Sequence, residues 1–113
     1  MHELSIAGFV LDVALQHAEG RRVTRVELQV GRLRQVVPDA LRFAFELLAR
    51  GTAAEGATLA IEDVGIVGAC RACGEESPQA GLPLRCAACG GLALAVLRGE
   101  ELSVQWLELA DAA

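Results

Sequence analysis

Four cysteines form two matched pairs, and they are the only cysteines in the chain. The pairs are Cys70 with Cys73 and Cys86 with Cys89; each pair, with the glycine that follows it, is called a knuckle below. Four thiolates at this spacing can surround one tetrahedral ion, and zinc is the usual occupant. The glycine can take a positive φ, which turns the loop and directs backbone N–H groups at the sulfurs. We therefore predict a closed, structural zinc site with the ligands Cys70, Cys73, Cys86 and Cys89.

The first residues offer a second candidate metal site. The amine of Met1, the next backbone amide nitrogen and the imidazole of His2 can close fused chelate rings around one ion. Ni(II) and Cu(II) favour planar sites rich in nitrogen, and they promote the amide deprotonation that this binding needs. A histidine at position two is, however, more often a solvated terminal residue. The residues alone leave both interpretations open. His17 is interpreted as a packed or surface histidine of a helix.

No catalytic set of side chains stands out. Ser5, Ser77 and Ser103 lie in separate segments, and none is in the context of a nucleophile elbow. No glycine-rich loop of the kind that cradles phosphate is present. Because four thiolates leave zinc no open position for water or substrate, we expect a protein that is not an enzyme.

Composition limits the partners and the location. The chain has 113 residues and a net charge of −5, and all ten basic residues are arginine. An acidic chain is a poor electrostatic match to phosphate backbones, so we expect no nucleic-acid partner. No apolar run approaches the roughly 18–20 residues of a membrane span, and no basic segment precedes an apolar one as in a signal peptide. We expect a cytoplasmic protein, and in that compartment thiols favour metal over disulfides.

The hydrophobic pattern predicts helices at residues 4–18 and 38–50 and strands at 23–30, 57–67 and 102–109. Pro38 fits the first turn of the second helix. The residues predicted to face the core are Ile6, Phe9, Val10, Val13 and Ala14 in the first helix, Leu41, Phe45 and Leu48 in the second, and Leu102, Val104 and Trp106 in the last strand.

The last strand needs a sheet to join, because an isolated strand leaves its ladder groups unpaired. We therefore predict an α+β fold: a small sheet of about three strands with two helices, into which a zinc-ribbon-like module is inserted. The α/β domain comprises residues 1–67 and 100–113, and the zinc-binding module comprises residues 68–99.

These segments together resemble the HypA/HybF family of hydrogenase nickel-incorporation proteins. Residues 1–5 (MHELS) are similar to the family's N-terminal signature, and residues 30–46 to its segment with V-P-E-A-L-x-F-A-F-E. Residues 56–62 (GATLAIE) resemble its G-A-x-L-x-I-E strand, and the knuckles and residues 99–102 (GEEL) complete the order. Apart from the knuckles, no segment is a specific signal by itself. The resemblance is specific because the five segments occur in order over nearly the whole chain.

The resemblance implies a nickel metallochaperone. It would bind Ni(II) as transient cargo through His2, backbone nitrogen at Glu3 and the amine of Met1, with structural Zn(II) on the four cysteines. Its partners would be a HypB-type GTPase and the large subunit of [NiFe]-hydrogenase, with a second copy of itself as a further candidate. Some relatives add a histidine near the end of the module, where this chain has Arg98, so the resemblance supplies no fourth nickel ligand here. Two alternatives stay open: a zinc-ribbon adaptor for protein or nucleic acid, and a rubredoxin-like electron carrier.

Overall fold

The computed structural model describes residues 2–111. It divides into two compact units: the described parts of residues 1–29, 36–62 and 103–113 form the first, and residues 30–35 and 63–102 form the second. The elements, in chain order, are α1 (His2–Ala18), β1 (Val23–Gly31), a 3-10 turn (Arg32–Arg34), α2 (Pro38–Ala49), β2 (Thr58–Val64), β3 (Ile66–Cys70), β4 (Glu76–Gln79), β5 (Leu94–Arg98) and β6 (Leu102–Leu109). The predicted α+β class, with two helices and a small sheet, is confirmed.

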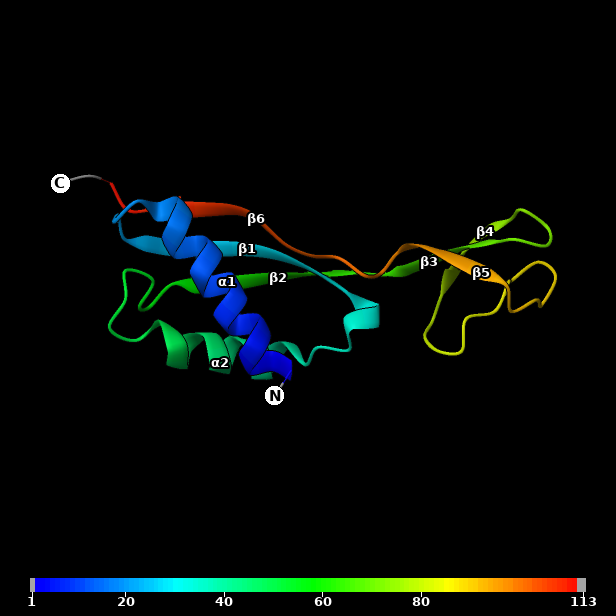
Figure 1. Cartoon of the computed structure of the whole chain (residues 1–113), viewed down its shortest axis with the longest axis horizontal. Coiled ribbons are helices and arrows are strands. Elements are labelled where there is room, and N and C mark those ends of the chain that lie inside the picture. The colour runs from blue at the N-terminus through cyan, green and yellow to red at the C-terminus, as the bar shows by residue number, and fades with distance from the viewer. Residues whose placement is uncertain (1, 112–113) are drawn as a thin grey trace. The chain divides into compact units, whose positions relative to one another are not determined.

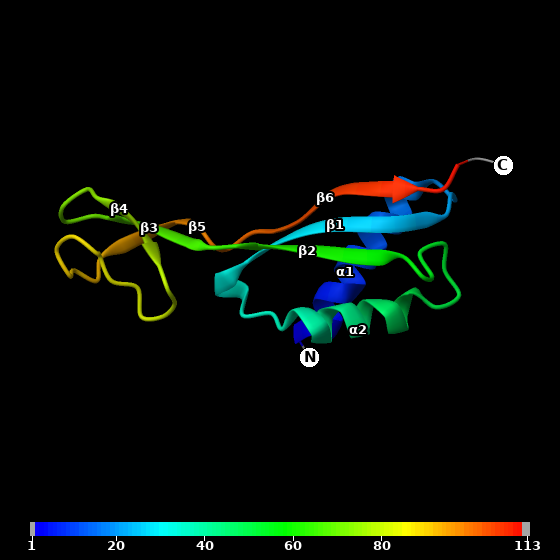
Figure 2. The same cartoon turned by 180° about the vertical axis from the view of Figure 1, so that it is seen from behind.

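The first sheet has three strands in the order β2-β1-β6. β1 and β2 run in the same direction and β6 runs in the opposite direction, and α1 crosses one face of this sheet (Figures 1 and 2). The antiparallel pairing of β6 agrees with the bonds from Ala110 N to Arg22 O and from Gly31 N to Glu101 O. The last strand thus joins the N-terminal sheet, as its lone position in the sequence required.

The two helices contact each other, and each buries a stripe at helical spacing. In α1 the residues with no exposure at all are Ala7, Val10 and Ala14, so the helix approaches its neighbours through small side chains. Phe9, predicted to be buried, is 48% exposed, because it lies one position off the stripe that these residues define.

Pro38 begins α2 as predicted, and Leu41, Ala44, Phe45 and Ala49 form its buried stripe. Leu48 was also expected to face inward but is 38% exposed. In β6, Trp106 is 49% exposed, while its neighbour Leu107 is half-buried. The period assigned Phe9, Leu48 and Trp106 to the core, but apolar side chains also remain on protein surfaces, so an apolar residue is not buried by its type and spacing alone.

The second sheet also has three strands, in the order β4-β3-β5, with both pairs antiparallel. The pairing of β3 with β4 aligns Ile66 with Gln79, and the pairing of β3 with β5 is irregular between Val67 and Gly68. The single strand predicted for residues 57–67 is in fact β2 and β3, which part at Gly65 so that each joins a different sheet. No helix within residues 2–111 is long and apolar enough to cross a membrane.

Two glycines bring backbones together where β1 enters the second unit. Gly31 N donates to Glu101 O over 2.7 Å, and Leu33 N donates to Gly99 O over 2.8 Å. A Cβ at residue 31 would overlap the carbonyl group of Gly99. Gly99 itself has φ +120, a conformation that side chains disfavour. This crossing therefore requires glycine at the end of β1 and at residue 99, between β5 and β6.

We predict that Gly31→Ala lowers the free energy of unfolding by about 1–3 kcal/mol, the usual cost of overpacking. The added methyl would meet backbone atoms, which cannot move aside as a flexible side chain can. Gly65→Ala is the matched control, because nothing lies within 4 Å of a Cβ there. Urea unfolding of the two variants beside the native protein measures the difference. Equal stability of Gly31→Ala and the native protein would contradict the close approach.

Candidate metal centre

The first knuckle grows directly out of a strand. Cys70 is the last residue of β3, and the chain turns through Gly74 before β4 begins. Gly74 has φ +82, and its N–H donates to Cys70 O over 2.8 Å; Cys70 N donates in turn to Glu75 O, also over 2.8 Å. These two bonds close the loop and turn the side chain of Cys73 back towards that of Cys70.

The second knuckle repeats the same turn without a strand of its own before it. Gly90 has φ +74 and donates from its N–H to Cys86 O over 2.9 Å, while Cys86 N donates to Gly91 O over 2.8 Å. The positive φ predicted for the knuckle glycines is thus present at both. Identical local sequence, Cys-x-x-Cys-Gly, gives identical backbone bonding at the two knuckles.

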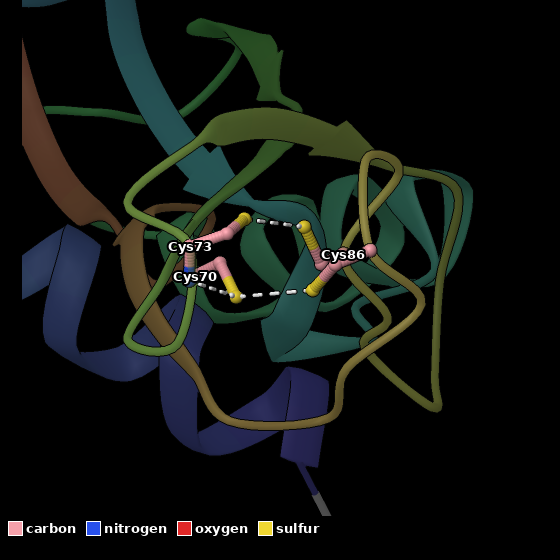
Figure 3. A group of neighbouring side chains, drawn as sticks. Cys70, Cys73 and Cys86 are labelled. Carbon is pink, nitrogen blue, oxygen red and sulfur yellow. Dashed lines mark hydrogen bonds between the residues drawn. The ribbon is translucent and has the colours of Figure 1, made fainter.

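The four sulfurs meet in one place (Figure 3). All lie within 4.8 Å of one another, with Cys70 Sγ 3.7 Å from Cys89 Sγ and Cys73 Sγ 3.6 Å from Cys86 Sγ. None is in a disulfide. Zinc bound tetrahedrally at 2.3 Å from each sulfur would separate the sulfurs by about 3.8 Å. The donor set and its spacing therefore fit zinc, and four such ligands would leave the ion no free position.

Backbone N–H groups and neighbouring thiols have opposite effects on the pKa values of the cysteines. The N–H of Cys73, which points at Cys70 Sγ over 3.5 Å, together with that of Ala72, lowers the pKa of Cys70 to about 6. The N–H of Cys89 likewise lowers the pKa of Cys86. The N–H of Glu75 favours the thiolate of Cys73, but the adjoining cysteine sulfurs, Cys86 first, outweigh it and raise the pKa to about 12. The close sulfurs therefore oppose the ionisation of all four thiols, and a bound cation would favour it.

In the part of the chain that the structure describes, these cysteines are the one group of three or more His, Cys, Asp or Glu side chains close enough to share an ion. Cys70 and Cys86 are buried, whereas Cys73 and Cys89 are exposed. His17 lies in the last turn of α1 and is exposed, which agrees with its interpretation as an ordinary helix histidine.

The N-terminal candidate site is described only in part. Met1 lies outside the described residues, and His2 is the exposed first residue of α1. The carboxylate of Glu3 accepts a hydrogen bond from Val37 N over 3.2 Å, and Val37 is the residue that caps α2. That bond, followed by one from the N–H of Glu3 itself, lowers the pKa of Glu3. Glu3 therefore joins the beginnings of the two helices and keeps a negative charge beside His2.

Two residues of the second unit were missed by sequence reasoning. Ser77 and Gln79 lie on β4 as buried polar side chains, although Gln79 reads in the sequence as part of an ordinary loop between the knuckles. The only local signal is that they alternate, Ser-x-Gln, as inward-facing strand residues do. Nothing in the sequence shows what their polar atoms bind.

We predict that Cys73→Ser abolishes stoichiometric zinc binding and unfolds the knuckles, because three thiolates cannot close the site. Ala72→Ser is the matched control: it adds a hydroxyl to the same exposed turn and removes no ligand. Metal analysis and amide NMR of the two variants provide the readouts, with the signals of the first unit expected to persist. One full equivalent of zinc in Cys73→Ser, with unchanged signals for the knuckles, would disprove the four-cysteine assignment.

Comparisons with known proteins support the same interpretation of the motifs. The family model described as "Hydrogenase/urease nickel incorporation, metallochaperone, hypA" matches residues 1–109. The hydrogenase maturation factor HypA of Geotalea uraniireducens is 48% identical over 109 residues, which are 96% of this chain and 99% of that protein. HypA of Nostoc punctiforme is 38% identical over 111 residues, covering 98% of this chain and 97% of the relative.

Solved structures share the fold. The solution structure of the Ni metallochaperone HypA from Helicobacter pylori aligns with a TM-score of 0.68 at 21% identity, over 96% of this chain and 97% of that one. A second solution structure of a HypA protein aligns with a TM-score of 0.71 at 22% identity, over 97% of each chain. The chain therefore belongs to the HypA family of hydrogenase/urease nickel-incorporation metallochaperones.

Proposed function

We propose that this chain carries Ni(II) on its N-terminus and delivers it to the large subunit of [NiFe]-hydrogenase, while Cys70, Cys73, Cys86 and Cys89 hold structural zinc. The observation that carries the proposal is the position of His2, which is the first residue of α1 and is exposed. The chain also belongs to a nickel-incorporation family. The protein would act as a cytoplasmic carrier rather than as a catalyst.

The start of a helix suits the proposed nickel donors. The first N–H groups of an α-helix have no partner within the helix. Nickel can therefore displace the amide proton of Glu3, which is released to solvent, without breaking the helical ladder; only the contact of this N–H with the Glu3 carboxylate is given up. The carboxylate of Glu3 is already engaged by Val37 N, so the side chain holds the first turn in place while the backbone nitrogen serves as a ligand. The Met1 amine and the His2 imidazole would complete a nitrogen-rich set.

The chemistry of the two donor sets supports a division of roles. Four thiolates enclose their ion and leave no position from which a partner can take it. An exposed terminal site holds its ion by fewer bonds and can release it to a competing set of ligands. Cu(II) should bind the terminal nitrogen donors more tightly than Ni(II), so affinity alone does not select nickel. Metal supply and docking to the correct partner would provide the selectivity.

Partner docking is proposed on the first unit, close to the cargo. Asp12 lies on the exposed side of α1, Glu19 directly follows the helix, and Glu3 lies at its beginning. These acidic residues are candidates for contact with a HypB-type GTPase or with the hydrogenase subunit that receives the ion. Association with a second copy of the chain is a further candidate use of this surface.

We predict that His2→Ala folds normally but binds nickel much more weakly, whereas His17→Ala binds it as the native protein does. His17 is the matched control because it is an exposed histidine at the other end of the same helix. A Gly-Ser extension before Met1 should also weaken binding, since it moves the primary amine although it removes no side chain. Isothermal titration with Ni(II) measures all three proteins. Native affinity in His2→Ala would refute the site, and native affinity in the extended protein would exclude the amine as a ligand.

Acidification should release nickel from the native protein. Protons compete with the metal for imidazole, amine and amide nitrogen, so the apparent affinity should fall as the pH is lowered. Repeating the titration at several pH values, with proton release recorded in buffers of different ionisation enthalpy, tests this. Binding that is independent of pH and releases no protons would contradict nitrogen ligation.

In cells, replacing the native protein by His2→Ala should leave the hydrogenase large subunit without nickel and lower hydrogenase activity. High external nickel should partly restore activity, because mass action can replace a carrier but cannot replace an enzyme's chemistry. The measurement is hydrogenase activity with and without added nickel, beside a strain carrying His17→Ala. Full activity of the His2→Ala strain at low nickel would instead favour an adaptor built on the zinc module.

A further inference from the structure

The side-chain amide of Gln79 bonds to both backbone polar groups of Arg85, at the entry to the second knuckle. Gln79 is the last residue of β4 and is 9% exposed. Arg85 N donates to Gln79 Oε1 over 2.7 Å, and Gln79 Nε2 donates to Arg85 O over 2.8 Å. Arg85 directly precedes Cys86, the first ligand of the second knuckle. The amide of Gln79 thus pairs with the chain at Arg85 as a neighbouring strand would.

Ser77 extends this arrangement to the other side of Cys86. It is the preceding inward-facing residue of β4 and is 6% exposed. Ser77 Oγ accepts a hydrogen bond from Gln79 Nε2 over 3.1 Å and a longer one from Ala87 N over 3.5 Å. Among the described residues, no buried side-chain nitrogen or oxygen lacks a partner, so the pair is fully satisfied by these contacts.

The two knuckles differ in how they are attached to the second sheet. The first continues β3, which pairs with both β4 and β5 through its backbone. The second lies in the segment between Gln79 and Leu94, where no strand is formed. Its own backbone bonds, from Cys86 to Gly91 and from Gly90 to Cys86, are internal. Its exit is fixed by the bond from Arg71 N to Ala93 O, and its entry is fixed by Gln79.

We propose that Gln79, supported by Ser77, is a positioning residue of the metal site: it holds the second knuckle so that Cys86 and Cys89 face Cys70 and Cys73, and it thereby slows the loss of zinc. This inference rests on the zinc site proposed above. For the second knuckle to swing away from the ion, both bonds to Arg85 must break, and buried groups that lose their partners pay a desolvation penalty. Partners that orient metal ligands typically change metal affinity by 10–100-fold when they are removed.

The chain contains a matched control for this residue. Gln105 donates from Nε2 to Ser103 Oγ, so β6 repeats the Ser-x-Gln pair of β4 on an exposed surface of the other unit. Gln79→Met and Gln105→Met remove the same amide and keep a side chain of similar length. Only the first leaves the polar groups of Arg85 without their partners.

The experiment measures zinc release from each full-length protein to an excess of a colorimetric chelator, together with hydrogen exchange at the amide of Arg85. We expect Gln79→Met to release zinc about 10–100-fold faster than the native protein and to exchange the Arg85 amide faster. Gln105→Met should match the native protein in both. Ser77→Ala should accelerate release less than Gln79→Met, because its contact with the knuckle is the longer one. Release at the native rate from Gln79→Met would overturn the proposal.

Cobalt substitution distinguishes a failure of the four-cysteine site from a failure of the role proposed for Gln79. Co(II) bound by four thiolates has strong charge-transfer bands, which the native protein and Gln79→Met should share, with weaker binding in the variant. If Gln79→Met cannot fold its second unit, Gln79→Asn keeps the amide on a shorter side chain that cannot reach both groups of Arg85, and it too should release zinc faster. Native release from Gln79→Asn would then overturn the role of Gln79. Absence of the thiolate bands in the native protein would overturn the zinc site itself, and this proposal with it.

Discussion

Four sulfurs within 4.8 Å of one another are the constraint on which the second unit depends. Thiols at this spacing resist joint ionisation, as the raised pKa of Cys73 beside the lowered pKa of Cys70 records. A divalent cation removes the conflict by binding all four as thiolates. The knuckle glycines, the turn bonds and the small sheet β4-β3-β5 all serve to keep these sulfurs together. A sheet of such short strands has little core of its own, so a bound ion would contribute much of its stability.

The proposed N-terminal site differs from the four-cysteine site in its exposure and in its donor atoms. Its one described side chain, His2, is exposed, and the remaining proposed donors are backbone and terminal nitrogen. What the fold supplies there is position: the bond from Val37 N to Glu3 fixes the first turn of α1 beside the first turn of α2. In the proposed function, an ion held in this way would be held for transfer, whereas an ion enclosed by four sulfurs would be held for shape. The same chain would thus keep one metal and give up another.

Much of the fold follows from local rules that the sequence displays. Pro38 marks the beginning of α2, and β6 occupies the predicted residues 102–109, although its alternation did not show which face is buried. The four-cysteine cluster follows from spacing alone. The split at Gly65 was missed because strand-forming residues lie on both sides of it, and tertiary pairing sends β2 and β3 to different sheets. The role of Gln79 was hidden for a related reason, since its partner is the backbone of Arg85, and backbone groups are the same at every position of a sequence.

The division of metals between two donor sets is the central claim, and X-ray absorption at the zinc and nickel edges tests it most directly. The sample is the native protein loaded with one equivalent of each metal. We predict a zinc spectrum that fits four sulfur neighbours at about 2.3 Å and a nickel spectrum that fits only nitrogen and oxygen neighbours. Sulfur in the nickel shell, or nitrogen in place of sulfur in the zinc shell, would contradict the account.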